Sequence, residues 1–208
     1  MEERAMFKAF GIDWVILDFE YPVSMGCNYV KEGATGILAI TRKLVTESRF
    51  ASSRNQKDPN NWKNSMVYRE LEKFIERDIP CPDVLWSRFI DLRDARGYGT
   101  YGIIPCRVSS LTAEEYKRYR ERLPKYLGDW WTMTPTVSIP KVLNLDMVNT
   151  SVEAVSRTGN LYTSDVENIG VGFPAVCLFR KEFVDDNMPV IREDGTEVPV
   201  IPPTYPVL

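Results

Sequence analysis

The segment Asp13–Asp18 reads DWVILD, and together with the segment Gly36–Thr41, which reads GILAIT, it decides the fold expected for this chain. Both runs are short and apolar, and both are bounded by glycine or by charged residues. Runs of this length and composition are typical of buried β-strands. We therefore expect the two segments to pair as a hairpin with a long, glycine-containing connection.

Two helices are expected further along the chain. Apolar residues recur at i, i+4, i+7 and i+8 from Val67, which predicts a helix over residues 65–79, before two prolines. Thr112 and Glu115 have the spacing of a capping box and predict a second helix, which Pro124 closes. The base-rich second half of this helix is interpreted as a solvated face rather than a phosphate site.

The remaining segments suggest strands and a distinct tail. Residues 101–108 and 173–180 are predicted strands, and residues 152–163 are predicted to form a hairpin across Thr158 and Gly159. Residues 83–100 are ambiguous, and their apolar positions from 85 to 92 fit a short helix. We divide the chain into a domain over residues 1–180 and a proline-rich C-terminal arm over residues 181–208, packed on the domain or on a neighbour.

Composition excludes several classes of chemistry. The chain has 208 residues, a net charge of −3 and no histidine. The lack of histidine excludes Ser-His-Asp and Cys-His catalysis, histidine-ligated zinc and a histidine pH switch. The negative net charge argues against nucleic acid as a partner, since such surfaces usually carry an excess of lysine and arginine.

The four cysteines are predicted to be reduced. They contain no C-x-x-C pair, which argues against a zinc or iron–sulfur site. Cys106 and Cys177 lie in apolar stretches and are expected to be buried thiols, whereas Cys81 lies between two prolines in a loop. The charged start of the chain predicts no secretory signal, and the lack of a long apolar run predicts no membrane span. We therefore expect synthesis in the cytoplasm.

Six motifs in order resemble one family. Their positions and sequences are Phe10–Asp18 (FGIDWVILD), Gly36–Thr41 (GILAIT), Asn60–Ser65 (NNWKNS), Ser110–Tyr116 (SLTAEEY), Trp130–Pro135 (WWTMTP) and Gly170–Val176 (GVGFPAV). The resemblance covers roughly residues 7–180. It is to a bacterial and phage domain family of unknown function, related in pattern to C-type-lectin-like and formylglycine-generating-enzyme-like folds.

This resemblance implies an α+β fold. The expected architecture is a twisted antiparallel sheet flanked by two helices, with irregular loops on one side. In C-type-lectin-like proteins of this sort, the loops after the tryptophan motif and before the last strand contact ligands. Phage members of the family include tail and receptor-binding proteins, which implies a place in a virion.

The loops near residues 132–172 supply the candidate ligand-binding residues. A tryptophan next to hydroxyl side chains can stack on a sugar ring, and short carboxylates and carboxamides are used in calcium-dependent sugar binding. The alternatives are a buried tryptophan and solvated loops without a ligand. The candidates are Trp131, Asn144, Asp146, Asn149, Ser151, Asp165 and Asn168.

The preferred function is non-enzymatic. We expect a phage-type virion or tail protein that binds a cell-surface glycan or protein receptor, is homo-oligomeric, contacts neighbouring virion subunits and needs no cofactor or metal. One alternative is a purely structural virion component held by its C-terminal arm. A less favoured alternative is a formylglycine-generating-type oxidase, in which Cys106 and Cys177 would have to meet.

Overall fold

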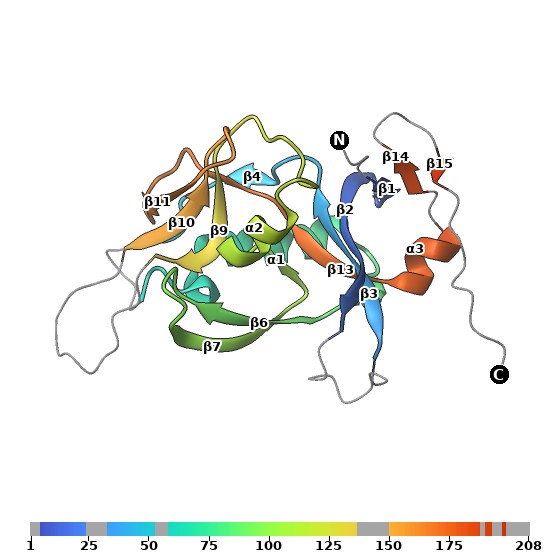
Figure 1. Ribbon diagram of the computed structural model, residues 1–208, viewed down its shortest axis with the longest axis horizontal. Helices are drawn as coiled ribbons and strands as arrows, with labels where there is room; N and C mark the ends of the chain where they lie inside the picture. The colour runs from blue at the N-terminus through green and yellow to red at the C-terminus, as the bar shows by residue number, and fades with distance from the viewer. Residues whose placement is uncertain are drawn as a thin grey trace.

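The computed structural model describes residues 5–23, 33–52, 58–136, 150–187, 190–192 and 197–198. The chain is a mixed α+β protein that is rich in β-sheet, which confirms the expected fold class. Figure 1 shows β1 (Ala5–Ala9) and α3 (Lys181–Asn187) on one side of the molecule, and the hairpin of β6 (Arg88–Arg93) and β7 (Gly99–Cys106) on the other. The described helices are η2 (Trp62–Asn64), α1 (Met66–Asp78), η3 (Pro82–Val84), α2 (Ala113–Tyr119) and α3 (Lys181–Asn187).

The first sheet has the strand order β15-β14-β1-β2-β3-β13-β5, and β8 also pairs with β13. The strand pairs of this sheet are antiparallel throughout the described residues. Its strands are β1 (Ala5–Ala9), β2 (Ile12–Pro22), β3 (Thr35–Thr41), β5 (Leu85–Trp86), β8 (Val108–Ser109), β13 (Val176–Arg180), β14 (Val190–Arg192) and β15 (Glu197–Val198). The predicted segments 13–18 and 36–41 thus pair as β2 and β3.

The other strands form a second sheet and a separate hairpin, where we had expected one sheet. The second sheet has the order β11-β10-β9-β12-β4, in which only β12 and β9 run parallel. Its strands are β4 (Thr46–Glu47), β9 (Trp130–Pro135), β10 (Ser151–Val155), β11 (Leu161–Asp165) and β12 (Gly172–Phe173). The hairpin pairs β6 (Arg88–Arg93) with β7 (Gly99–Cys106).

The centre of the first sheet is buried on both faces. Along β3, Ile37 and Ala39 belong to one apolar cluster, whereas Leu38 and Ile40 belong to the other. Successive side chains of a strand point to opposite faces, so this alternation means that the sheet separates two cores. The buried residues of α1 belong to the first cluster, and those of α2, such as Tyr116, belong to the second.

Both predicted helices are confirmed, with their caps. Helix α1 begins after Ser65, whose Oγ accepts a hydrogen bond from the Tyr68 N–H at 2.9 Å. Helix α2 begins after Thr112, and both hydrogen bonds of the predicted capping box with Glu115 are present. A side-chain oxygen at the N-cap satisfies a backbone donor that the helix itself leaves unpaired.

Two segments differ from the sequence prediction. Residues 85–92 are extended, not helical, because they pair with β13 and β7 and bury alternate side chains along β6. The predicted strand 173–180 is split between the two sheets: Phe173 ends β12, and Val176 begins β13, after Pro174. Proline lacks the N–H that a continuous ladder needs.

The described part of the tail packs on the domain. It begins with an unexpected helix, α3, in which Val184 is fully buried in the first apolar cluster. Strand β14 then pairs with β1, with Ile191 opposite Met6. The prolines from Pro199 onward lie outside the described residues.

Gly36 gives a test of the sheet packing. A Cβ at this position would lie 2.7 Å from the Phe179 carbonyl oxygen, whereas a Cβ at Gly170 would lie 3.7 Å from its nearest neighbour, Asn168 Oδ1. We expect Gly36→Ala to lower the free energy of unfolding by about 1–3 kcal/mol through overpacking. Gly170→Ala, measured in the same urea titration, is expected to change it by less than about 0.5 kcal/mol. Equal effects of the two substitutions would contradict the close approach of β3 and β13.

Candidate functional site

An open polar groove lies beside α2. Its volume is about 680 Å³, and it is bordered by the β6–β7 hairpin, by α2 and by residues of β2, β9 and β10. Tyr21 and Phe89 contribute aromatic rings, and Thr134 contributes a hydroxyl group. The charged residues of the lining are Asp91, Arg93, Asp94, Glu114, Glu115, Lys117, Arg118 and Glu153.

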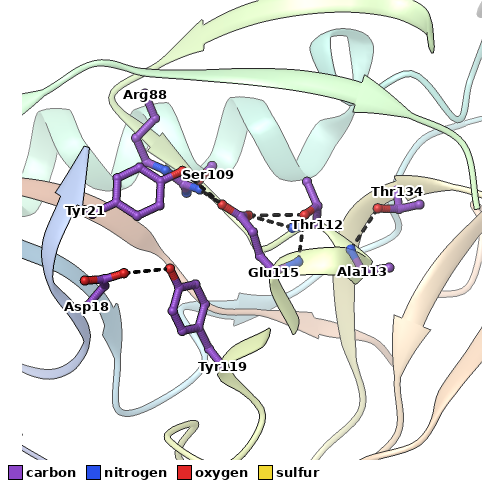
Figure 2. Close-up of polar contacts among 9 residues, drawn as sticks. All are labelled: Asp18, Tyr21, Arg88, Ser109, Thr112, Ala113, Glu115, Tyr119 and Thr134. Atoms are coloured by element: carbon purple, nitrogen blue, oxygen red, sulfur yellow. Dashed lines mark hydrogen bonds and ion pairs between the residues drawn. The ribbon is translucent and has the colours of Figure 1, made fainter. Parts of the chain in front are cut away.

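Glu115 joins three elements beneath the groove, as Figure 2 shows. One carboxylate oxygen accepts a hydrogen bond from the Thr112 backbone N–H at 3.0 Å. The other oxygen is the ion-pair partner of Arg88 and accepts from the Tyr21 hydroxyl at 3.4 Å. The glutamate of the α2 capping box therefore also binds β6 and β2.

Arg88 is a buried charge with several partners. Its side chain is 1% exposed, and one terminal nitrogen donates to Ser109 Oγ at 2.6 Å. The guanidinium carbon lies 5.3 Å from the centre of the Tyr21 ring. Burial alone would lower the pKa of Arg88, but the Glu115 carboxylate and the Tyr21 hydroxyl outweigh burial and raise it. Arg88 therefore stays charged, and its charge is compensated by Glu115.

Two further contacts hold α2 against the sheets (Figure 2). The Tyr119 hydroxyl donates to Asp18 Oδ2 on β2 at 3.0 Å. At the other end of the helix, the Ala113 N–H donates to Thr134 Oγ1 on β9 at 2.9 Å. The helix is thus attached to the first sheet at one end and to the second sheet at the other.

The rim opposite α2 is the turn of the β6–β7 hairpin. The buried carboxylate of Asp94 accepts from the backbone N–H groups of Arg96 and Tyr98, at 2.9 and 3.1 Å. It also forms an ion pair with the Arg96 guanidinium at 2.9 Å. Asp91 and Arg93 pair on the surface at 2.7 Å. These acids of the rim are occupied in holding the turn.

Arg118 interacts with the Tyr119 hydroxyl group, which leaves three charged groups of the groove for a ligand. Among the described residues, Glu114, Glu153 and Lys117 form no hydrogen bond or ion pair through their side chains. Burial raises the pKa of Glu153, and the charge of Lys117 partly offsets this rise. The groove therefore presents two carboxylates and one ammonium group from α2 and β10.

The expected ligand contact of Trp131 is wrong. Its side chain is 0% exposed, its indole N–H donates to the Ser48 carbonyl at 2.9 Å, and its ring packs edge-on against Phe50. Trp130 is also buried, although alternation along a strand had suggested that one of the two would face outward. Every residue of β9 is buried, so both faces of this strand are covered. The alternative of a core tryptophan is correct.

Three other candidates lie together at one end of the β10–β11 hairpin. Ser151 is directly opposite Asp165, and the Asn168 N–H donates to the Asp165 carbonyl at 3.0 Å. Asp165 and Asn168 also stabilise their own loop, because their side-chain oxygens accept from the backbone N–H groups of Glu167 and Gly170. Asn144, Asp146 and Asn149 lie outside the described residues.

This cluster shares a strand face with the groove. Ser151 and Glu153 are two residues apart on β10, so their side chains point to the same side of the sheet. Glu153 lines the groove, so the cluster adjoins it along β10. Sequence reasoning missed the groove itself. Thr112 and Glu115 stood out only as a capping box, which identifies a helix start, and Lys117 and Arg118 only as part of a solvated helix face.

The described cysteines are free thiols. Cys106 and Cys177 are buried and Cys81 is exposed, as predicted. Burial raises the pKa of both buried thiols, that of Cys106 to about 12, although the positive charge of Arg88 acts in the opposite direction. Both thiols are therefore protonated at neutral pH and lack the thiolate needed for nucleophilic or redox chemistry.

No family model, curated protein or solved structure matches the chain. Within the described residues, no group of three or more cysteine, aspartate or glutamate residues is arranged to hold a metal ion. In the same part of the chain, no helix is long and apolar enough to cross a membrane.

The buried ion pair gives a second prediction. Arg88→Met leaves the Glu115 carboxylate without its main partner, so we expect a loss of about 3–5 kcal/mol in the free energy of unfolding. The matched control is Arg93→Met, which breaks the exposed pair with Asp91 and is expected to cost less than about 1 kcal/mol. Similar losses in the two variants, measured by urea denaturation, would show that Arg88 does not organise the site.

Thiol labelling gives a third prediction. In a Cys27→Ser chain, which removes the thiol outside the described residues, a disulfide reagent at pH 8 should modify only Cys81 rapidly. Cys106 and Cys177 should react only after denaturation with urea, because they are buried and protonated. Rapid labelling of either buried thiol in the native chain would reopen the oxidase alternative.

Proposed function

We propose that this chain is a non-enzymatic, phage-type virion or tail protein that binds a cell-surface glycan receptor in the groove beside α2. The observation that carries the proposal is an open, polar groove of about 680 Å³ whose unpaired charged groups stand beside aromatic rings. Sugar hydroxyl groups are bound by carboxylate and amino groups, and the apolar faces of sugar rings pack on aromatic side chains.

Packing of the motif residues supports a C-type-lectin-like fold for this domain. Trp62 and Trp131 come from two of the six motifs, and both pack against Phe50 in the core. Gly172, from a third motif, pairs with Trp130 between β12 and β9. Motifs that are far apart in the sequence therefore meet in one structural unit, as a resemblance to a single domain family would require.

The state of the titratable groups favours binding over catalysis. Most acids of the groove are already engaged: Asp94 in a turn, Asp91 with Arg93, and Glu115 with Arg88. The two remaining carboxylates, Glu114 and Glu153, have no thiol beside them in the lining, and the hydroxyl groups of Thr112 and Thr134 already accept hydrogen bonds from helix N–H groups. The groove thus offers hydrogen-bonding groups at fixed positions without a set for acid–base or covalent catalysis.

A glycan array of bacterial surface polysaccharides tests this proposal, with binding measured for the wild type and for a Glu153→Gln/Lys117→Gln variant. We expect the double variant to lose on the order of tenfold or more in affinity for any glycan bound, because each lost charged hydrogen bond costs about 1.5–3 kcal/mol. Glu76→Gln, an exposed change on α1, serves as the matched control and should bind normally. Binding that survives the double variant unchanged would place the receptor site outside the groove.

The structural alternative depends on the C-terminal arm. In this alternative, residues 181–208 grip a neighbouring virion subunit. Since Val184 is buried in the core and β14 pairs with β1, a deletion from residue 181 would damage the domain itself. Truncation after Val198 is the cleaner test, with light scattering to measure the mass. If the full chain is an oligomer and the truncated chain is a folded monomer, the result favours this alternative. If the truncation leaves the oligomeric state of the chain unchanged, the result weighs against it.

A further inference from the structure

A second pocket lies beside α1 and shares no lining residue with the groove. Its volume is about 260 Å³. It is bordered by the β1–β2 turn, by the segment Thr41–Val45 that follows β3, and by the second half of α1. We call it the basic pocket, because Arg42, Lys43 and Arg77 line it against a single acid, Asp13.

The two bases of the Thr41–Val45 segment are available to a ligand. Arg77 is engaged, since its guanidinium donates to both carboxylate oxygens of Asp78 at 2.6–3.1 Å and lowers the pKa of that carboxyl group. Among the described residues, the side chains of Arg42 and Lys43 form no hydrogen bond or ion pair. The lining thus carries a net positive charge in a chain whose net charge is −3.

The backbone beneath these bases is held in place. The Arg42 N–H donates to the Asp13 carbonyl at 2.9 Å, and the Val45 N–H donates to the Phe173 carbonyl at 2.8 Å. The Thr41 N–H donates to the Ala175 carbonyl, and the Thr41 hydroxyl accepts from the Ala175 N–H. The Thr41 carbonyl accepts from the Tyr126 hydroxyl at 2.6 Å. A fixed backbone reduces the ordering cost that a bound ligand would otherwise incur.

The wall of the pocket is apolar. Phe74 from α1, with 6% of its surface exposed, packs in the same apolar cluster as the half-buried Ile12 and Val45, and half-buried Leu44 also lines the pocket. A fully hydrated ion would leave this surface uncovered. An organic anion satisfies both parts of the site, with its charged oxygens at Arg42 and Lys43 and its apolar part against Phe74.

We propose that the basic pocket binds a small organic oxyanion, a carboxylate or phosphate monoester joined to a short apolar group. The proposal is independent of glycan binding in the groove, because the two sites use different residues and different elements. A volume of about 260 Å³ limits the occupant to a small molecule or to the end group of a larger one.

Titration calorimetry of the full chain with butyl phosphate, butyrate, inorganic phosphate and butanol tests the proposal. We expect saturable binding of butyl phosphate, butyrate or both, weaker binding of inorganic phosphate and no binding of butanol, because both the charge and the apolar group contribute. The stronger of the two organic anions identifies the oxyanion. Equal binding of inorganic phosphate and butyl phosphate would overturn the role of the apolar wall.

Charge variants locate the site. Arg42→Gln/Lys43→Gln should lower the affinity for the bound probe on the order of tenfold or more. Asp13→Asn should raise this affinity, because the substitution removes the single acid of the lining. Arg107→Gln is the matched control, since Arg107 is exposed and lines neither the groove nor the basic pocket. Lack of saturable binding by either organic anion, or equal weakening by Arg107→Gln, would overturn the proposal. The glycan array result should be unaffected by the variants of this pocket.

Discussion

The structure depends on a sheet whose central strands, β2, β3 and β13, are buried on both faces. The central stretches of such strands must be apolar at successive positions, as Trp14–Leu17 and Ile37–Ile40 are, and each face must be covered by another element. Helix α1 covers one face and α2 lies against the other, so the two helices are fixed relative to each other through the sheet. The groove and the basic pocket both inherit their geometry from this layered arrangement.

A buried charge then restricts how α2 can sit. Arg88 has lost almost all contact with water, and the cost of burying it is tolerable only while Glu115 stays beside it. Since Glu115 also belongs to the capping box of α2, the start of this helix, the strand β6 and Tyr21 of β2 are joined in one network. A ligand in the groove therefore meets side chains on a rigid frame, which favours selective binding over adaptation.

The parts of the fold that were predictable are those that local sequence determines. Both helix starts follow from short-range rules, because Ser65 and Thr112 bond to backbone groups within three residues. Residues 85–92 were ambiguous in the sequence and fitted a short helix, because their extended structure comes from pairing with β7 and β13 rather than from their own pattern. Trp131 was misplaced for a similar reason: both faces of β9 are covered by distant segments, which the alternation of its own sequence does not reveal.

The groove could not be predicted because its charged groups come from separate segments, each of which looks like an ordinary solvated surface when taken alone. Glu153 belongs to an unremarkable strand, and Lys117 to a helix face whose bases we had interpreted as solvent-exposed. The topology alone brings them together, across α2, β6 and β10. The same holds for the basic pocket, where Arg42 simply follows a strand in the sequence, and where its proximity to Phe74 depends on α1 packing against the sheet. Both sites therefore arise from the packing of helices on a sheet rather than from a motif, so the residues that form them can be recognised only once the fold is known.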